Sequence, residues 1–445
     1  MIYVGVDTGG TFTDFVVWDA GKMQTHKTLS TPHAPEQAIV NGLHSLGLDQ
    51  QPIVVIHGST VATNAVLEGK GVKTAYITNQ GFRDVLTIGR QARDELYNLQ
   101  PQPKQPPVAS EYCLEVDCRL TAEGQWLSEL NDKKLQQLIA QLKQLDVQSV
   151  AINLLFSYVD SSAEQQIAKA LQSADERLFI SISSEVLAEI GEYERGMSTW
   201  LNAWVGPLIQ GYVERLQHAL GDASLAIMQS SGETMAASLA ANQAVRMLLS
   251  GPAGGLVGAR HVAALSGYKH LMTFDMGGTS SDVALLDNAI GLTRRGKLAG
   301  FPVAVPMVDM HTIGAGGGSI AYLDAGGLLQ VGPESAGASP GPVCYGQGGR
   351  QPTVTDANLL LGRIPRQARL GGNLQLDYAA AAAAMQKLAD EMGLSLLETA
   401  EGIVQIANEH MARALRVISV QKGYNPADFV LVSFGGAGGL HVTAL

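Results

Sequence analysis

The chain has 445 residues, 46% of them apolar, so it can bury more than one hydrophobic core and should contain at least two domains. Its 30 Lys and Arg residues face 41 Asp and Glu, and this net charge of −11 without a basic block argues against a nucleic-acid partner. Three cysteines without a C-x-x-C pair, no apolar run of the roughly 18 to 20 residues that span a membrane, and no signal sequence predict a cytoplasmic protein with no membrane contact.

The first predicted strand, residues 2–7, leads into the pattern D-x-G-G-T-x-x-D at residues 7–14. A second strand is predicted at residues 15–18, so the pattern should form the turn of a β-hairpin. Glycines in such a turn permit positive φ and leave backbone N–H groups open to an anion, and a Thr hydroxyl can donate to a phosphate oxygen. The residues predicted to contact a phosphate here are Thr8, Gly9, Gly10, Thr11 and Thr13.

The rest of residues 1–80 alternates strand and helix patterns, which indicates an α/β layer with a mostly buried sheet. His57 lies at a predicted strand end, where open α/β sheets place ligand groups. It is therefore a candidate for facing a substrate, although the run after it is equally typical of an ordinary capped helix. The predicted strands are 24–29, 53–57 and 72–78, and the predicted helices are 35–46 and 60–68.

A second α/β layer is predicted in residues 81–190 as a continuation of the N-terminal region. Arg90 and Arg93 are candidates for meeting a phosphate or a carboxylate, although exposed arginines more often form solvated ion pairs. The proline-rich run 100–109 should be a surface loop or linker. The predicted helices are 131–145 and 163–171, and the predicted strands are 150–156 and 178–182.

A third region, residues 191–445, begins with a long helical pattern at 193–220. Trp200 and Trp204 lie four residues apart and hence on one helix face, which favours core packing or a subunit interface over cofactor stacking. A strand is predicted at 225–229. The glycine-rich run 250–255 then begins a helix, an arrangement that suits an anion or close packing.

The D-x-G-G-T-x-x-D pattern occurs again at residues 275–282, once more between two strands. One copy alone could be an ordinary Gly-Gly hairpin, but two matched copies favour a clasp that holds a polyphosphate from opposite sides. We predict that Asp7 and Asp275 orient a hydrated Mg²⁺, an ion that keeps several waters and few protein ligands. Asp14 and Asp282 would fix the hairpins, polarise a water or accept a proton. The second set of predicted phosphate contacts is Gly277, Gly278, Thr279 and Ser280.

Glycine-rich loops follow the second hairpin, and Gly316 and Gly317 are predicted to place amides near phosphate or ribose. Asp309 and His311 would share a face of an extended strand and could form a metal pair, although two ligands are fewer than a catalytic zinc needs. The remaining predictions are a surface loop or lid at 333–352, helices at 356–361, 378–392 and 396–419, and a strand at 429–434 before the loop 435–441.

The duplicated hairpin with a later glycine-rich loop resembles the actin, Hsp70 and sugar-kinase ATPase superfamily. It resembles more closely the hydantoinase A / 5-oxoprolinase family, which is related to the ATP-using subunits of acetone and acetophenone carboxylases. Residues 57–64 are similar to that family's HGTTVATN run, with Ser59 in place of Thr. The chain departs from the family at residues 230–233, which read SSGE where SNGG is usual, and at Gly439, which replaces a proline.

The resemblance implies an α/β fold with two RNase H-like lobes and a nucleotide cleft between them. The first lobe would begin in residues 1–80, and residues 191–445 would form the second lobe, incomplete at its C-terminus. ATP and Mg²⁺ would be the cofactors, with the adenosine beside Gly435, Gly436 and Gly438.

The implied activity is ATP-dependent hydrolysis of a cyclic amide such as a hydantoin or 5-oxoproline. The work would be shared with a B-type hydantoinase/oxoprolinase subunit in an oligomer. An ATP-using carboxylase subunit has the same motifs, and a non-catalytic ATP-driven switch of the Hsp70 or actin type is a further alternative.

Overall fold

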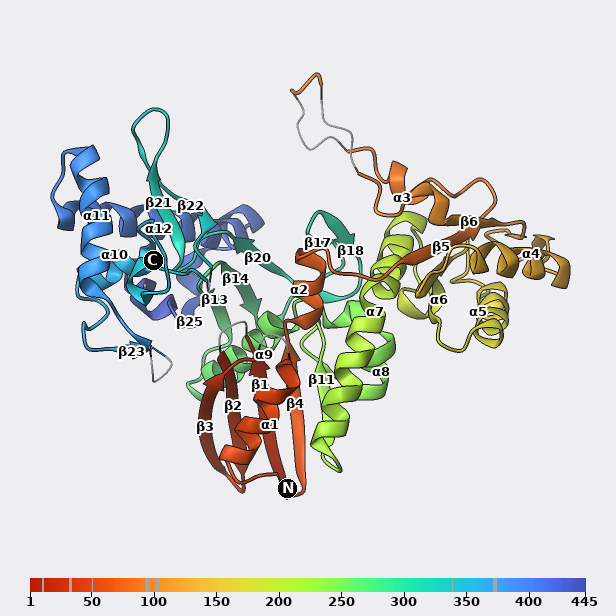
Figure 1. Ribbon diagram of the computed structural model, residues 1–445, viewed down its shortest axis with the longest axis horizontal. Coiled ribbons are helices and arrows are strands. Elements are labelled where there is room, and N and C mark those ends of the chain that lie inside the picture. Colours follow the sequence, from red (N-terminus) through yellow and green to blue (C-terminus); the bar gives the residue numbers. More distant parts are fainter. Residues whose placement is uncertain are drawn as a thin grey trace.

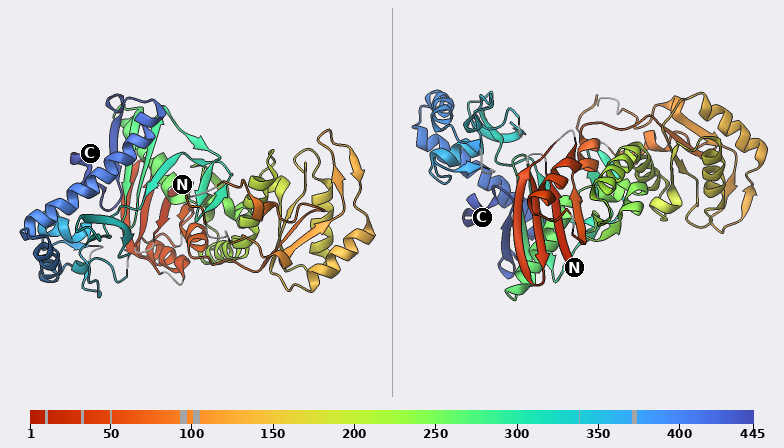
Figure 2. Two further views of the ribbon diagram at one scale, coloured as in Figure 1. Left: turned by 90° about the horizontal axis from the view of Figure 1, so that it is seen from above. Right: turned by 60° about the horizontal axis from the view of Figure 1, so that its bottom comes forward.

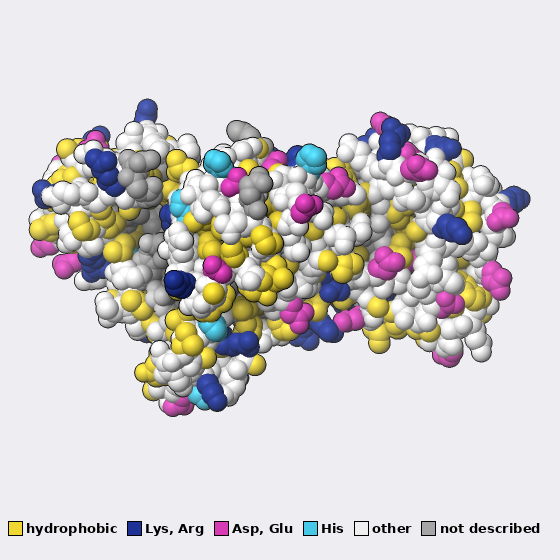
Figure 3. Space-filling view, turned by 90° about the horizontal axis from the view of Figure 1, so that it is seen from below, with side chains coloured by type: hydrophobic (Ala, Val, Ile, Leu, Met, Phe, Trp, Pro, Cys, Tyr) yellow, Lys and Arg dark blue, Asp and Glu magenta, His cyan; other side chains and the backbone are white. Residues whose placement is uncertain are grey.

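The chain is an α/β protein built on mixed β-sheets, as the alternating patterns predicted (Figure 1). The computed structural model describes all residues except 10–11, 32–33, 50, 93–96, 101–104, 338 and 371–373. None of the helices in this part of the chain combines the length and the apolar character that crossing a membrane requires. Acidic and basic side chains are intermixed on the face of the molecule that Figure 3 shows.

The first sheet carries the N-terminal hairpin and has the strand order β12-β11-β4-β1-β2-β3. Strands β1, β4 and β11 are parallel, and the remaining pairs are antiparallel. Strand periodicity directs Val4, Val6 and Phe15 to one face, where helix α1 (Pro35–Ser45) packs so closely that a side chain at Gly42 would overlap the Phe15 ring. The strands are β1 Ile2–Thr8, β2 Phe12–Asp19, β3 Lys22–Leu29, β4 Ile53–Ser59, β11 Ser224–Met228 and β12 Thr234–Ala236.

The second sheet repeats the central arrangement of the first. Strands β13 and β14 form the second hairpin, as β1 and β2 form the first, and β25 lies parallel to β13 as β4 lies parallel to β1. Strand β20 pairs with the outer side of β14, as β3 does with β2. The strands are β13 His270–Met276, β14 Ser281–Asp287, β15 Ala289–Ile290, β20 Met310–Ile313 and β25 Val430–Phe434.

A third sheet, here called the outer sheet, is parallel throughout and has its own core. Helices α4 (Asp132–Lys143) and α5 (Ser162–Ala174) pack on it. The outer sheet and helices α10–α12 lie at opposite ends of the molecule, with the first sheet between them (Figure 2). The strands of the outer sheet are β5 Thr74–Asn79, β6 Cys113–Val116, β9 Ser149–Asn153 and β10 Phe179–Ile182.

Helix α7 (Glu192–Leu220) connects the outer sheet to the first sheet. Trp200 and Trp204 stack with ring centroids 5.1 Å apart, and both rings contact Phe301, which confirms a packing role for this pair. Because β11 follows α7 and joins the first sheet, residues 191–445 include two strands of that sheet. The boundary between the first and second sheets therefore falls after β12, whereas the predicted third region begins at residue 191.

Helix α9 (Ser250–Leu265) passes from the first sheet to the second. Its first residue, Ser250, donates a hydrogen bond to the Ser59 carbonyl at the end of β4. Its apolar side chains, including Leu256, pack on Leu271 and Leu286 of the second sheet. Helix α12 (Leu396–Ile418) covers the other face of that sheet with α10 (Val354–Leu360) and α11 (Tyr378–Met392).

The remaining elements are short. They are helices α2 Val61–Leu67, α3 Val85–Ile88, α6 Ser183–Val186 and α8 Ala237–Asn242, and strands β7 Arg119–Leu120, β8 Trp126–Ser128, β16 Leu292–Thr293, β17 Gly296–Leu298, β18 Phe301–Val303, β19 Met307–Val308, β21 Ser319–Leu323, β22 Leu329–Ser335, β23 Arg369–Leu370 and β24 Leu374–Gln375.

Candidate functional site

The two hairpins have the same geometry. Asp7 pairs with Asp14 across the first hairpin, and Asp275 pairs with Asp282 at the equivalent register of the second. The Gly9 N–H donates to the Phe12 carbonyl at 3.0 Å, and the corresponding bond of the second turn, from the Gly277 N–H to the Ser280 carbonyl, measures 3.1 Å. Gly10 and Thr11 lie outside the described residues.

Side-chain hydrogen bonds hold both turns. Ser30 Oγ lies 3.0 Å from Thr13 Oγ1 and donates to the Gly9 carbonyl at 2.7 Å. At the position equivalent to Thr13, Ser281 Oγ donates to the Ala315 carbonyl at 2.5 Å. Thr13 and Thr8 are buried, so their side chains lie within the protein and not on the surface where a nucleotide contact was predicted. Gly277, Gly278 and Thr279 are exposed, and Ser280 is half-buried.

The two hairpins lie close enough for their leading carboxylates to interact. Burial, then Asp282, then Asp7 raise the pKa of Asp275 to about 6. Helix α9 begins beside the first hairpin, because a Cβ added to Gly251 would lie 3.7 Å from Asp7 Oδ1. A carboxylate of the first hairpin therefore acts on one of the second, although the two hairpins are far apart in the sequence.

The two carboxylate pairs differ in charge balance. Lys27 forms an ion pair with Asp14 at 2.7 Å, and the pKa of Asp7 is raised by burial and by Asp14 but lowered by Lys27. The residue opposite Asp282 on β20 is Thr312, whose hydroxyl donates to Asp282 at 2.5 Å. Burial raises the pKa of Asp282, and the Thr312 hydrogen bond opposes that shift. Among the residues that the structure describes, the second pair thus has no counterpart of the Lys27 cation that pairs with Asp14.

The predicted glycine loops pack against the second hairpin. The Gly317 N–H donates to the Gly277 carbonyl at 3.0 Å, and the Gly316 N–H donates to Ser319 Oγ at 2.9 Å. These two amides are therefore already bonded to protein, which corrects the prediction that they face phosphate or ribose. A Cβ on Gly316 would lie 2.7 Å from the Gly278 carbonyl group, so this loop packs directly against the turn of the second hairpin.

The loop after β25 closes on Asp275. Gly435 has φ of +82°, and a Cβ there would overlap Asp275 Oδ1. The Ala437 N–H donates to the Met276 carbonyl at 2.9 Å, which ties this loop to β13. Gly436 has open space around its Cβ position, whereas a Cβ on Gly438 would meet Ser433 Oγ at 2.5 Å.

Two other candidate residues have structural roles. His57 is fully buried, its Nε2 lies 2.7 Å from the Tyr212 hydroxyl, and burial lowers its pKa to about 4. It therefore does not face a substrate. Arg90 forms a bidentate ion pair with Glu194 at 2.7 and 2.8 Å, and Arg93 lies outside the described residues.

Asp309, one half of the suggested metal pair, already has a cationic partner. Asp309 bonds to Lys422 at 2.6 Å, and the described residues contain no group of three or more His, Cys, Asp or Glu side chains that could hold a metal ion without other ligands. The three cysteines are buried thiols without a disulfide.

Sequence reasoning missed Ser30, Lys27 and Thr312, which fix or neutralise the hairpins. Lys27 had a detectable signal, because it lies on a predicted strand adjacent to the one that begins after Asp14 and pairs directly with that residue. Thr312 had a weaker signal, because it lies 30 residues from Asp282 along the chain and the sequence does not show that their strands pair.

An α/β protein with duplicated carboxylate hairpins is therefore the class that fold and site define. The profile of the hydantoinase/oxoprolinase family matches residues 195–445, and that of the hydantoinase/oxoprolinase N-terminal region matches residues 3–174. The chain belongs to the hydantoinase/oxoprolinase family, as its motifs predicted.

Two relatives illustrate the match. The chain is 37% identical to caprolactamase subunit alpha of Pseudomonas jessenii over 99% of its own length and 66% of the relative's. It is 32% identical to the acetophenone carboxylase gamma subunit of Aromatoleum aromaticum, over 99% of its own length and 64% of the relative's. The chain thus spans about two thirds of the length of these relatives.

The same likeness holds for solved structures. The crystal structure of the ATP-dependent caprolactamase from Pseudomonas jessenii superimposes with a TM-score of 0.86 at 36% identity, over 100% of this chain and 67% of the other. The nucleotide-free structure of an acetone carboxylase gives a TM-score of 0.82 at 27% identity, over 99% of this chain and 66% of the other.

Proposed function

We propose that this chain is the ATP-using part of a cyclic amide hydrolase of the hydantoinase/5-oxoprolinase type. In this proposal the first and second sheets are the cores of two RNase H-like lobes, and Mg·ATP binds between the hairpins. The observation that carries the proposal is that Asp7 of the first hairpin lies close enough to Asp275 of the second to add to the pKa shift that burial and Asp282 cause, so the two hairpins approach each other. The ATP-dependent caprolactamase, which matches the whole chain, supports the use of ATP.

The residues of the site fit Mg·ATP. Asp7, Asp275 and Asp282 concentrate negative charge, and a divalent cation would relieve the repulsion that raises the pKa of Asp275. Mg²⁺ bound with a nucleotide needs only one or two carboxylates, since phosphate oxygens and waters complete its shell. The bound ion would neutralise charge on the phosphates during transfer. Gly435 has no room for a side chain beside Asp275, so its backbone lies directly against that carboxylate.

Each residue of the site then has a defined task. Asp7 and Asp275 orient the metal, and the exposed Gly278 and Thr279 of the second turn offer backbone N–H groups and a hydroxyl to phosphate oxygens. Thr13 and Ser281 contribute indirectly, because they hold the turns in place. Phosphoryl transfer of this kind depends on positioning and charge neutralisation. These residues supply both without forming a covalent intermediate with the substrate.

The phosphoryl acceptor would be the amide oxygen of the substrate. Transfer of the γ-phosphoryl group to that oxygen breaks the bond to the β-phosphate and releases ADP. Water then adds to the amide carbon, and the ring C–N bond breaks as the nitrogen takes up a proton, which leaves an acyl phosphate. A second water attacks the carbonyl carbon of the acyl phosphate, so the former amide oxygen leaves in inorganic phosphate. A B-type subunit would complete this second stage.

An ¹⁸O experiment tests this chemistry. A lactam labelled at its carbonyl oxygen is incubated with Mg·ATP, the chain and its B-type partner, and the phosphate is analysed by mass spectrometry. We expect one ¹⁸O per phosphate released, and Asp7→Ala and Asp275→Ala should abolish turnover while the far-ultraviolet circular dichroism spectrum stays unchanged. Unlabelled phosphate would contradict phosphorylation of the amide oxygen, and unchanged turnover in both variants would refute the hairpin assignment.

The second candidate function is the ATP-using subunit of a ketone carboxylase, which the acetophenone carboxylase and acetone carboxylase likenesses favour. It predicts ATP turnover that depends on bicarbonate and a ketone and is unaffected by lactams. A switch of the Hsp70 or actin type predicts slow ATP hydrolysis that neither small molecule stimulates.

A further inference from the structure

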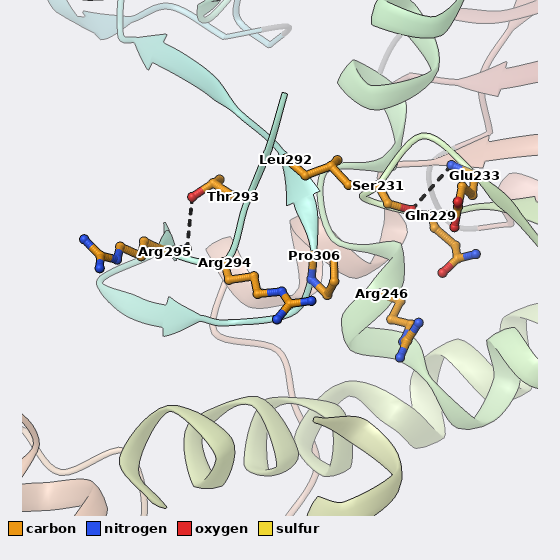
Figure 4. A pocket seen from close by; sticks show the side chains of 9 residues that line it. All are labelled: Gln229, Ser231, Glu233, Arg246, Leu292, Thr293, Arg294, Arg295 and Pro306. Atoms are coloured by element: carbon orange, nitrogen blue, oxygen red, sulfur yellow. Dashed lines mark hydrogen bonds between the residues drawn. The ribbon is translucent and has the colours of Figure 1, made fainter. Parts of the chain in front are cut away.

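A pocket lined by three arginines lies beyond the end of β11, apart from the residues assigned to ATP. Its volume is about 560 Å³, which suits a small molecule. Gln229 and Ser231, from the loop after β11, form one side of it. Arg246 lies on the turn before α9, and Arg294 and Pro306 come from the segment between β16 and β19 (Figure 4).

The pocket lies at the same sheet edge as Asp7. Ile227 on β11 is level with His57 on β4, and His57 is level with Val6 on β1, so Gln229 is level with Thr8 two strands away. Since neighbouring strands are about 4.8 Å apart, about 10 Å separates these two backbone positions. The carboxyl ends of parallel strands are where open α/β sheets bind ligands.

One buried residue fixes the pocket walls. The Ser230 N–H donates to the Arg246 carbonyl at 2.7 Å, and Ser230 Oγ donates to the Pro306 carbonyl at 2.9 Å. The Val308 N–H donates to the Ser230 carbonyl at 2.8 Å. Because Ser230 joins all three segments, the positions of the surrounding side chains are set by the fold.

The pocket is positively charged in a protein with a net charge of −11. Three arginines and one carboxylate, Glu233, line it. Arg294 shares its charge with Glu189 in an ion pair. Figure 4 shows Arg294 extending toward Pro306 and Arg246, while Arg295 points the other way.

Arg246 is the residue that lacks a partner. Within the described residues its side chain makes no hydrogen bond or ion pair, and its Nε atom is buried and unsatisfied. A buried donor without an acceptor is costly. The Nε and Nη atoms of arginine form a fork that matches the two oxygens of a carboxylate or a phosphate. A small oxyanion in the pocket would therefore satisfy Arg246.

We infer, building on the proposed function, that this pocket binds the carboxylate of an anionic cyclic amide and that Arg246 is its main ligand. The lactam ring would lie between the pocket and the hairpin edge, where the amide oxygen can meet the transferred phosphoryl group. The only acceptor oxygen of an unsubstituted neutral lactam is its carbonyl oxygen, which the proposed reaction places at the phosphoryl group, so such a ring would leave Arg246 unsatisfied. The specificity of this chain is thus for a carboxylated ring.

Binding of two matched lactams tests the inference. 5-Oxoproline and 2-pyrrolidinone share a five-membered ring and differ only in the carboxylate. Isothermal titration calorimetry with the full chain, with and without Mg·ADP, should give an affinity about 10- to 100-fold higher for 5-oxoproline, as expected for a charged hydrogen-bonded pair. Arg246→Gln should remove this preference, and Arg246→Lys should reduce the affinity for 5-oxoproline by about tenfold because the fork is lost.

The controls separate this inference from the proposed function. Arg177→Gln, at an exposed residue of the outer-sheet region that pairs only with Asp175, should leave binding of both lactams unchanged. The Arg246→Gln variant should still bind Mg·ATP, because Arg246 is not assigned to the nucleotide site. If the unmodified chain fails to bind Mg·ATP, the nucleotide site is contradicted but the pocket is not. Equal affinity for both lactams, unchanged binding in Arg246→Gln, or equally tight Arg246-dependent binding of inorganic phosphate alone would overturn the carboxylate assignment.

Discussion

Replacing Asp275 by Asn should stabilise the protein while abolishing its proposed use of ATP. Asp275 has a pKa of about 6 in the folded chain against an ordinary value of 3.8, because burial and two neighbouring carboxylates disfavour its charge. The folded state therefore binds this proton more tightly than the unfolded state, and stability falls as the pH rises from 3.8 to about 6. Above that range the loss is complete, and at 1.36 kcal/mol per pKa unit it amounts to no more than about 3 kcal/mol. Solvent near the carboxylate reduces this to about 1 to 3 kcal/mol.

Denaturant titrations at pH 7.5 and pH 4.5 measure this effect. At pH 7.5, Asp275→Asn should raise the free energy of unfolding by about 1 to 3 kcal/mol, because Asn has the shape of Asp and no charge to bury. At pH 4.5 the difference should fall to about a third of that value, because the folded carboxyl is then mostly protonated whereas the unfolded one is mostly ionised. Asp222→Asn, at an exposed position after α7, should show no such change with pH. A destabilised Asp275→Asn variant at pH 7.5, or a difference independent of pH, would refute the charge repulsion on which the site assignment rests.

Four further predictions concern the same region. Affinity for Mg·ATP should weaken as the pH falls below about 6, because Asp275 must lose its proton to hold the metal. Titration with a fluorescent nucleotide measures this affinity, and an affinity that does not change with pH would contradict the prediction. Gly435→Ala should cost more than about 1 kcal/mol of stability and displace Asp275, whereas Gly436→Ala, with open space at its Cβ position, should unfold like wild type in thermal melts. Gly316→Ala should destabilise the second hairpin, which hydrogen exchange of the residue 277–281 amides would report, and Gly258→Ala on α9 is the matched control with free space. His57→Gln should lower the free energy of unfolding by about 1 to 3 kcal/mol through loss of the Tyr212 hydrogen bond, yet leave ATP turnover per folded molecule intact; a selective loss of turnover would restore His57 as a site residue.

The local elements of this protein follow from its sequence because their signals are local. The helices α4, α7, α11 and α12 bury residues at helical spacing, and the predicted ranges agree with their bounds to within a few residues. Both hairpins form where an Asp-x-Gly-Gly pattern interrupts two strand patterns, with the aspartates paired in the same register. Membership of the hydantoinase/oxoprolinase family was likewise readable from these short motifs.

The tertiary structure decided which of the predicted site residues are accessible to a ligand. His57 and Thr13 are polar residues next to a strand end, yet the alternation of side chains across the sheet puts both inside the core. Gly317 carries the right residue type for an anion loop, but its amide is already bonded to the second hairpin.

Two features could not be predicted from the sequence at all. The pKa of Asp275 is raised first by burial, then by Asp282, and further by Asp7 from the N-terminal hairpin, and the pocket around Arg246 depends on Ser230 joining three separate segments of the chain. Sequence patterns fix what each segment can form, since periodicity and turn residues act over a few positions. Which charges face one another is decided only when the sheets pack, because electrostatic interaction and burial depend on distances in space and not along the chain.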